Sequence, residues 1–433
     1  MDLRDRIDAL LPPSIKGKQE DEKHRRIEEL RSNIDRILGK SRVIKEPRPK
    51  PEPLSLDEIL AGRTVETKSG TVFMTEHHYP SDYSHGNRRL DEILDTPTDR
   101  LPIFIGEATG ETLSLSDAIF IDTETTGLSG GTGTYVFLLG AGFFTDKGFS
   151  ICQYFMRDFN EEPGLLHLVS RMVRDGKWVV TFNGKAFDLN LLATRFTLNR
   201  MPFPFTHIPH WDLLGTSRCI FKPRIGSCTL ANIEREVIGF ERHGDIPGVE
   251  IPAIYHNFIR NGDAGPLPTV FHHNLLDILS MVTIATLLLK GIHHKDFVRE
   301  FTPWEFLGFG RMLAAFDHVA ACQIWQHGLS LRGNEEIEYC LNKEISRAAK
   351  RTGDLDKAVK LWREMLKRPL LDPYVHEELA KYLEHKEKDY DNALALVEEA
   401  LMFFGHIDRW REFLEYRKKR LRVKRQRQRQ GCR

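Results

Sequence analysis

Two acidic residues follow a short apolar run in the segment AIFIDTETTGLSGGTGTY. The apolar residues are typical of a buried strand, and Asp122 and Glu124 come where this run ends. Because alternate residues of a strand point to the same face, we expect the two carboxylates to project together. Carboxylates at short range repel each other unless a cation lies between them, and hard oxygen ligands favour Mg²⁺ or Mn²⁺. The pair therefore indicates a divalent metal site, with a solvated strand end as the simpler alternative.

The glycine-rich stretch after this pair lacks the features of a phosphate-binding loop. Such a loop needs a lysine and leads into a helix, because the helix amides hold the anion. Here GLSGGTGTY has no lysine and leads into VFLLGAGFF, which is typical of a strand. The glycines instead fit a tight connection between neighbouring strands, and Gly127 permits close approach of the backbone to a ligand.

Two further acids stand in segments that would bring them to one edge of a sheet. Asp188 follows a buried strand and a turn, at the start of a helix, a position that faces the carboxyl edge of a sheet. Asp277 interrupts the apolar helix FHHNLLDILSMVTIATLLL, where a charge needs a partner or a cation. Taken singly, Asp188 is explained as a helix N-cap and Asp277 as a solvated edge of the apolar stripe. Their order and context together favour a shared site.

The elements that must position these acids follow an α/β pattern between residues 117 and 290. Hydrophobic periodicity predicts three strands, then a helix, a strand and a helix, over residues 118–121, 135–144, 149–156, 162–176, 177–184 and 185–199. This order predicts a mixed sheet with helices packed on it.

Length and composition limit the class of protein. A chain of 433 residues is too long for one compact core, and 41% hydrophobic with 29% charged residues is typical of a soluble, folded protein. No run of about 18 apolar residues stands out, which argues against a membrane span. The charged N-terminus does not resemble a secretory signal, and the six cysteines include no C-x-x-C pair. We therefore expect a cytoplasmic protein without a membrane partner.

Beyond about Trp304 the sequence is helical and weakly repetitive. The segments AACQIWQHGL, KAVKLWREML and NALALVEEAL align with Ala321, Ala358 and Ala393 in register, at offsets of 37 and 35 residues. Periods near 34 residues are typical of tetratricopeptide repeats. We expect stacked helical hairpins here, with a plain helical bundle as the alternative.

Charge is distributed unevenly along the chain. The last 17 residues contain ten Lys or Arg and no acid, which leaves ten more acidic than basic residues elsewhere. Such a block is typical of a solvated extension that contacts nucleic acid, and the alternative is that it folds back on the acidic remainder.

The expected segments are a charged, partly disordered N-terminal segment (1–56, helical over Glu20 to Leu38), a small lead-in region (57–116), the α/β domain (117–295), the helical repeats (304–416) and the basic tail (417–433).

Three short motifs resemble those of a known family. DTETTG, FNGKAFD and HHNLLD are similar to the three motifs of the DEDD exonucleases within the ribonuclease H-like superfamily. The long loop after the first motif and the helical repeats resemble the YprB-like branch. The resemblance covers residues 118–290 strongly and the repeats loosely. It implies an α/β ribonuclease H-like mixed sheet flanked by helices, followed by an all-α repeat domain.

The resemblance also implies a site and a reaction. By the motif match, the metal ligands are Asp122, Glu124, Asp188 and Asp277, and Asp122 bridges two Mg²⁺ or Mn²⁺ ions. Two such ions activate a water and stabilise the leaving oxygen of a phosphodiester. In this group the hydrolysis begins at a 3′ end, and it needs no covalent intermediate.

Two histidines are candidates for the residue that orients or deprotonates the water. His273 stands four residues before Asp277 and His272 five before, and these are the spacings of the two branches of the group. On a regular helix residues i and i+4 share a face, which favours His273. A helix that begins late would let His272 turn in instead.

Substrate contacts are expected from four further residues, Thr125 and Gly127 beside the first motif and Asn183 and Lys185 before the second. Asp212 in HWDLL is expected to have a structural role.

The predicted function is a metal-dependent 3′ to 5′ exonuclease acting on DNA or RNA, with the helical repeats available to a protein partner. The alternatives are a non-catalytic nucleic-acid-binding or scaffold protein on the same fold and a structure-selective endonuclease.

Overall fold

The computed structural model describes residues 54–106, 113–127, 131–175, 177–293, 301–368 and 372–431, together with Arg25 and Glu29. The chain divides into two units, Met1–Glu52 and Pro53–Arg433. Apart from Arg25 and Glu29, which are helical, the predicted N-terminal segment up to Pro53 lies outside the described residues. The sheet and the helices around it belong to the second unit.

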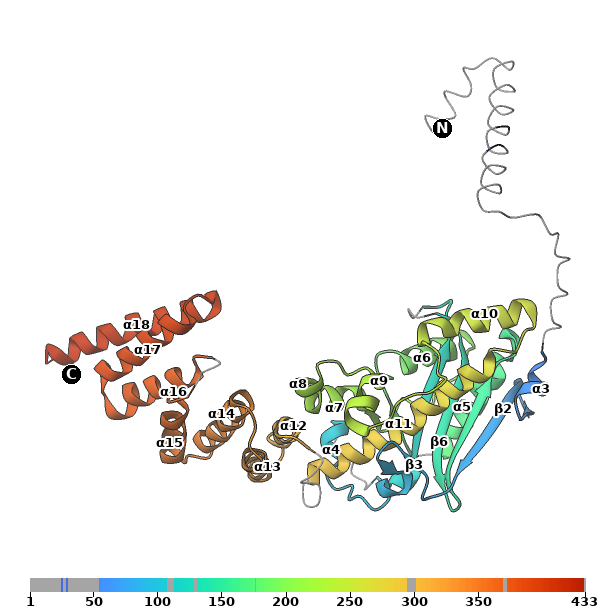
Figure 1. Ribbon diagram of the computed structural model, residues 1–433, viewed down its shortest axis with the longest axis horizontal. Helices are drawn as coiled ribbons and strands as arrows, with labels where there is room; N and C mark the ends of the chain where they lie inside the picture. Colours follow the sequence, from blue (N-terminus) through green and yellow to red (C-terminus); the bar gives the residue numbers. More distant parts are fainter. Residues whose placement is uncertain are drawn as a thin grey trace, which may run out of the picture. The chain divides into compact units, whose positions relative to one another are not determined.

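A seven-stranded mixed sheet forms the centre of the α/β part of the second unit (Figure 1). In spatial order its strands are β1 (Gly62–Thr67), β2 (Gly70–Tyr79), β7 (Gly148–Phe155), β6 (Val136–Thr145), β5 (Ala118–Thr125), β8 (Trp178–Thr181) and β9 (His210–Asp212). β5, β8 and β9 are parallel neighbours, and the other neighbours pair antiparallel. The predicted mixed α/β sheet is confirmed. Two short strands, β3 (Ser84–His85) and β4 (Arg88–Arg89), form a separate ribbon.

The first two strands come from the region that was expected to be a lead-in. β2 pairs antiparallel with β7, with Phe73 opposite Phe155, and both side chains are buried. Residues of this region therefore extend the sheet. The hydrophobic pattern did not predict β1 as a strand. It is an edge strand whose side chains are mostly exposed, so it lacks the apolar run of a central strand.

Two layers of helices cover the sheet. The helices of this part of the chain are α3 (Leu56–Ile59), α4 (Leu101–Ile105), α5 (Glu162–Asp175), α6 (Asp188–Leu198), α7 (Leu213–Ile220), α8 (Lys222–Ile225), α9 (Leu230–Ile233), α10 (Ile251–Asn261) and α11 (Leu267–His293). Phe120 of β5 packs in a core with α4, α7 and α11, whereas its neighbour Ile121 packs in a second core with α5, α6 and α10. This alternation follows the two-residue period of a strand and fixes which layer each later residue of β5 faces.

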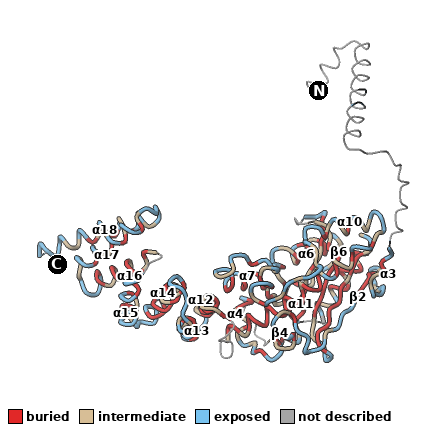
Figure 2. The backbone as a smooth tube through the Cα atoms, viewed as in Figure 1, coloured by how far each residue is buried: buried red, intermediate tan, exposed pale blue. Residues whose placement is uncertain are grey.

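α11 is the helix that lies closest to the sequence motifs on β5. Its 27 residues include an 18-residue window with a mean hydropathy of 1.9, which would suffice by length and composition to cross a membrane, but 89% of that window is buried inside the protein. It packs against β5, β6 and β7, and its buried residues are red in Figure 2. The sequence analysis found no such run because polar residues, among them Asp277, interrupt it. Burial on this scale is that of a core helix.

A helical region follows the sheet domain. Its helices are α12 (Pro303–Leu313), α13 (His318–Ser330), α14 (Glu335–Arg351), α15 (Leu355–Met365), α16 (Tyr374–Tyr382), the π-helical turn η6 (Leu383–Glu387), α17 (Tyr390–Phe404) and α18 (Asp408–Arg429). Each α-helix packs on the next along the chain. Three alanines that align in the sequence, Ala321, Ala358 and Ala393, lie on α13, α15 and α17, and all three are fully buried. The assignment to tetratricopeptide repeats stays a prediction.

The basic tail differs from the disordered extension that its composition suggested. From Arg417 to Arg429 the chain continues α18, which docks through the buried side chains of Leu414 and Leu421. Seven of its cations pair with acids of the preceding helices: Arg417, Arg420 and Lys424 with Glu384, Lys418 and Arg422 with Glu398, and Arg425 and Arg429 with Asp391. The alternative, in which the segment folds back on acidic surface, therefore describes it better. Charge counting missed the two leucines, seven residues apart, that fix one face of the helix.

Candidate active site

Asp122 and Glu124 stand at the end of β5 on the face that α11 covers. They follow Phe120 at intervals of two residues, and Phe120 packs in the core that contains α11. Oδ2 of Asp122 accepts a hydrogen bond of 2.8 Å from Nδ2 of Asn274 on α11. The pairing of β5 with β6 shifts register between Glu124 and Thr125, so regular sheet structure ends at this acidic pair.

Asn274 belongs to a buried polar network that the sequence analysis missed. Nε2 of Gln153 donates a hydrogen bond of 2.8 Å to Oδ1 of Asn274, and neither residue is exposed. Gly140 lies opposite Asp122 in the sheet, and a Cβ there would stand 2.2 Å from Oδ1 of Asn274. The missing side chain thus makes room for the amide that holds Asp122. A signal existed in the sequence, since Asn274 precedes Asp277 by three residues and the two share a helix face.

Asp188 is brought to the same end of the sheet by α6. It is the first residue of that helix, Phe187 takes the N-cap position, and Oδ1 of Asp188 accepts a hydrogen bond from Oγ1 of Thr123 in β5. The side chain is buried, and burial raises the pKa of Asp188 to about 6 against the hydrogen bond from Thr123, which acts in the opposite direction. The explanation of Asp188 as an N-cap is therefore wrong.

Asp277 forms an ion pair with an arginine that the sequence analysis did not single out. Arg242 lies between the helical turns η4 (Glu234–Ile238) and η5 (Gly248–Glu250), and its Nη2 contacts Oδ1 of Asp277. Nε and Nη2 of Arg242 each donate a hydrogen bond of 2.6 Å to the buried carboxylate of Glu234. Asp277 is only 17% exposed, so it is not a solvated edge of the helix. The segment FERHGDIPG has no periodic pattern that could have indicated this contact.

The two candidate histidines have different surroundings. Nδ1 of His273 lies 2.9 Å from both carboxylate oxygens of Asp245, and Nε2 of His273 lies 3.9 Å from Oδ2 of Asp277. Burial by itself would raise the pKa of Asp245, but hydrogen bonds from Arg242 and His273 lower it. His272 is exposed. The regular course of α11 therefore brings His273, and not His272, to the acids, as the i, i+4 spacing predicted.

The electrostatics of the carboxylates show that they act on one another. Burial raises the pKa of Asp122 well above its ordinary value, and the charges of Asp277 and Asp188 raise it further. Burial also raises the pKa of Glu124, with additional repulsion from Asp122, Asp277 and Asp188. The predicted carboxylates therefore lie close enough for their charges to act on Asp122 and Glu124.

The donor set fits a hard divalent cation, although the side chains are turned toward protein partners. Among the described residues, no three His, Cys, Asp or Glu side chains are already arranged around a common metal position. Asp122 accepts a hydrogen bond from Asn274, and Asp188 accepts one from Thr123. Asp277 forms an ion pair with Arg242. Buried, mutually repelling carboxylates are nevertheless the ligands that Mg²⁺ and Mn²⁺ prefer. Oδ1 of Asp277 contacts Arg242, so Oδ2 of Asp277 is the oxygen that would be available to a cation with this ion pair in place.

The metal-free protein should gain stability when Asp188 is replaced by Asn. The folded-state pKa of Asp188, about 6, lies above the ordinary value of 3.8, so ionisation opposes folding as the pH rises from about 4 through 6. Asp188→Asn keeps an acceptor for Thr123 and removes this charge. In EDTA, thermal unfolding followed by circular dichroism should show a higher melting temperature for the variant at pH 8. The difference should shrink toward pH 4.5, and a pH-independent difference would contradict this explanation.

The turn before α6 is held by Asp212, which confirms the structural role expected of that residue. The backbone N–H groups of Asn183 and Lys185 donate hydrogen bonds of 2.8 and 3.0 Å to its two carboxylate oxygens. Asp212 also caps α7 by accepting from the amide of Leu214 at 3.0 Å. Asn183 has a positive φ of 71° in this turn, and the side chain of Lys185 is exposed. The turn is rigidly placed beside Asp188.

The other two predicted substrate contacts lie at the opposite side of β5. Oγ1 of Thr125 donates a hydrogen bond of 2.9 Å to the carbonyl oxygen of Gly127, so this buried hydroxyl shapes the start of the loop. A Cβ at Gly127 would be 3.5 Å from Oγ1 of Thr134, an ordinary contact. Their contact with substrate stays a prediction.

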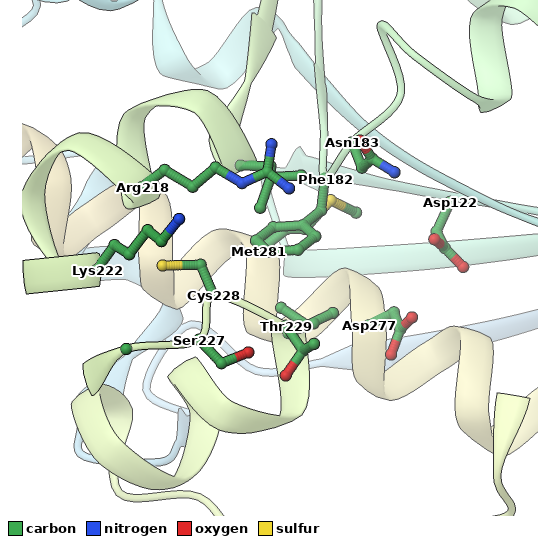
Figure 3. Close-up of a pocket in the computed structure, with 13 residues that line it drawn as sticks. Asp122, Phe182, Asn183, Arg218, Lys222, Ser227, Cys228, Thr229, Asp277 and Met281 are labelled. Carbon is green, nitrogen blue, oxygen red and sulfur yellow. The ribbon is translucent and has the colours of Figure 1, made fainter.

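A cavity of about 580 Å³ opens beside the acids. Figure 3 shows the carboxylates of Asp122 and Asp277 at one end and the cations of Arg218 and Lys222 at the other, with Phe182 between them. Arg218 comes from α7 and Lys222 from α8, and neither forms an ion pair within the described parts of the chain. A cavity with carboxylates at one end and unpaired cations at the other can take a phosphorylated ligand once metal ions neutralise the acids.

Comparisons with known proteins agree with this fold. Residues 119–289 match a family described as the RNase_H superfamily. The uncharacterized protein YprB of Bacillus subtilis (strain 168) is 30% identical over 335 residues, which cover 75% of this chain and 79% of that protein. The solved structure of the family B DNA polymerase from the archaeon Pyrobaculum calidifontis aligns with 55% of this chain and 29% of its own, with 18% identity and a TM-score of 0.33. The aligned part is a minor fraction of the polymerase, and a similarity at this level carries no further argument.

Proposed function

The chain belongs to the family of the Bacillus subtilis YprB protein and carries an RNase H superfamily domain, and on this premise we propose that it is a metal-dependent nuclease that shortens DNA or RNA from the 3′ end. The observation that carries the proposal is the group of four carboxylates, Asp122, Glu124, Asp188 and Asp277, at one end of the sheet. Burial and mutual repulsion raise the pKa of three of them, Asp122, Glu124 and Asp188. Such an arrangement is unfavourable unless a cation compensates the charges.

The proposed ligands of the metal ions are these four carboxylates, with Asp122 between the two ions. When bound, two divalent ions supply the Lewis acidity that activates a water and stabilises the leaving oxygen of the phosphodiester. The protein's part is to hold the ligands: Asn274 orients Asp122, and Thr123 orients Asp188. Both supports are buried, so they limit rotation of the carboxylates.

His273 is the proposed group that takes the proton of the attacking water. Asp245 accepts the hydrogen bond from Nδ1–H of His273, which leaves the lone pair of Nε2 on the side of Asp277. Asp245 is in turn held by Arg242, with Nη1 of the arginine 3.0 Å from Oδ2. Asp245 and Arg242 thus act as positioning residues for His273 and Asp277.

Two alternatives make different demands on these residues. A non-catalytic scaffold protein has no use for carboxylates that oppose their own ionisation in a buried position, so the raised pKa values argue against it. A structure-selective endonuclease would use the same acids and differs only in how the substrate enters.

An activity assay on four substrates tests the proposal. Single- and double-stranded DNA and RNA of one sequence should be incubated with the full-length protein in Mg²⁺, Mn²⁺ or EDTA. We expect hydrolysis of at least one substrate in the two metal buffers and none in EDTA. A protein that binds these substrates and cuts none of them under any metal condition would support the scaffold alternative.

Neutralising either cation of the cavity should weaken substrate binding and leave the chemistry nearly unchanged. In the part of the chain that the structure describes, Arg218 and Lys222 form no ion pair, and they lie away from the carboxylates (Figure 3). Loss of one phosphate contact on a single strand lowers affinity by roughly fivefold at 0.1 M salt. Arg218→Gln and Lys222→Gln should therefore each raise KM by about that factor, with kcat within about twofold. The matched control is Lys147→Gln, an exposed lysine in the turn between β6 and β7, and an equal rise in its KM would refute the assignment.

A further inference from the structure

A second charged cavity lies in the C-terminal helical region, far along the chain from the four carboxylates. It has a volume of about 390 Å³ and is lined by residues of α14, α15, α16, η6 and α18. Five of its lining residues are cationic, namely Lys350, Lys381, Lys386, Arg417 and Arg420. Glu378 is the acid among the described residues that line it. This cavity is therefore markedly basic, and the nuclease chemistry proposed above makes no use of it.

Arg417 is buried in the cavity wall without enough acceptors. Its side chain is 7% exposed, and its nearest carboxylate oxygens are 3.3 Å away on Glu384 and 4.0 Å away on Glu377. Nε of Arg417 and Nε of Arg420 are both buried, and neither has a hydrogen-bond partner among the residues that the structure describes. Burial, and then the charge of Arg420, lower the pKa of Arg417. Buried donors without acceptors are uncommon in proteins, and these two point to a missing anion.

Each carboxylate around the cavity pairs with more than one cation, so the cations outnumber the carboxylates. Glu384 is fully buried and pairs with Arg417, Arg420 and Lys424. Glu378 pairs with Lys350 and Lys381, and Glu377 pairs with Lys381 and reaches Arg417. Lys386 lines the same cavity. Six cations thus share three carboxylates in this region, and among the described residues five of these cations but only Glu378 of the acids line the cavity.

The cations of α18 are arranged along a line. Arg417, Arg420 and Lys424 recur at intervals of three and four residues, so they lie on one face of the helix and span about 10 Å along its axis. An extended polyanion matches a row of this length better than a single carboxylate does. Arginine forks also suit phosphate oxygens, which they bind in pairs of parallel hydrogen bonds.

We propose that this cavity binds the phosphodiester backbone of a single-stranded nucleic acid, as a contact for the strand that the RNase H-like domain degrades. The proposal rests on the proposed function for the identity of the polyanion. Tyr382 is a partly buried lining residue, and channels for single strands combine a positive wall with aromatic side chains. An acidic peptide would satisfy both the charge and the arginine forks, but it has no bases to stack on Tyr382.

The test measures binding without cleavage. In full-length protein carrying Asp122→Asn, with EDTA present, a fluorescent single-stranded oligonucleotide is titrated by anisotropy at several salt concentrations. Lys386→Gln with Arg420→Gln removes two cations from the cavity. The expected loss is roughly 25-fold in affinity at 0.1 M salt, with a salt slope smaller by about 1.4. The single variant Lys386→Glu, at an exposed position, should also weaken binding and does not depend on the buried arginines.

A matched control separates this cavity from general surface charge. Lys357→Gln with Lys360→Gln removes two exposed cations of α15 that do not line the cavity, and it should change affinity by less than about threefold. Equal losses in the control and cavity variants would overturn the inference. Displacement of the oligonucleotide by poly-glutamate at equal charge concentration would also overturn it, in favour of an acidic peptide.

The outcome also distinguishes this inference from the proposed function. Cavity-dependent binding by a protein that cleaves no substrate with any metal would contradict the nuclease and leave the binding site standing. Metal-dependent cleavage, together with an oligonucleotide affinity that the cavity variants leave unchanged, would support the nuclease and contradict the binding site in the cavity.

Discussion

Replacing Asp122 with Asn should abolish cleavage while the fold remains intact. Asp122 is the proposed bridge between the metal ions, and its neighbours act with it as a unit, so the rate should fall by more than about 10³-fold. Asn keeps an acceptor for the amide of Asn274. It also removes the charge of the Asp122 carboxyl, a group whose pKa is raised by burial and by repulsion from its neighbours. The melting temperature in EDTA should therefore equal or exceed that of the wild type. The measurements are single-turnover cleavage and thermal unfolding of the same preparations.

The control for this variant is Asp146→Asn. Asp146 is an exposed acid in the turn between β6 and β7, so the change has the same chemistry at a site without metal ligands. It should leave the cleavage rate unchanged. An Asp122→Asn protein that cuts at the wild-type rate would show that the carboxylates do not hold the reactive metal ions.

Replacing His273 with Ala should lower kcat by roughly 10²- to 10⁴-fold, the usual contribution of general acid-base catalysis. Its Nε2 faces Asp277 and its Nδ1 is held by Asp245, whereas His272 is exposed. His272→Ala serves as the matched control and should act like the wild type. The comparison is made by pre-steady-state kinetics at saturating Mg²⁺.

A variant of Asp245, which holds His273, provides a second test of His273 as the general base. Asp245→Asn should lower kcat by less than His273→Ala, with little effect on KM, because it disturbs the tautomer of the histidine and touches no substrate. The reverse pattern, in which His272→Ala is inactive and His273→Ala is not, would move the role to His272. Small, equal effects would mean that neither histidine handles the water.

Local pattern predicted the parts of the fold whose residues carry a regular signal. The apolar run into Asp122, the strand and turn before Asp188 and the helix around Asp277 each show a hydrophobic period, and their elements formed as β5, β8, α6 and α11. Helix geometry favoured His273 over His272, and His273 is the histidine that lies beside Asp245 and Asp277. The edge strand β1 escaped notice because exposed, mixed residues give no period.

The supports of the site depend on contacts that no local pattern records. Arg242 reaches Asp277 from an irregular segment 35 residues earlier, and Gln153 reaches Asn274 from a strand 121 residues away. The docking of α18 likewise depends on acids of other helices, although its composition resembles a disordered tail. Sequence reasoning found the acids that define the site, and the tertiary structure supplied the groups that hold them.

The most direct test of the proposed function follows the ends of the product. A single-stranded oligonucleotide labelled at its 5′ end should be incubated with the wild-type protein and Mg²⁺ or Mn²⁺ and sampled from the first seconds onward. We predict a ladder that shortens one nucleotide at a time from the 3′ end and is absent in EDTA and with Asp122→Asn. Internal fragments at the earliest times, or cleavage that persists without divalent ions or without the carboxylate of Asp122, would contradict a metal-dependent 3′ to 5′ exonuclease.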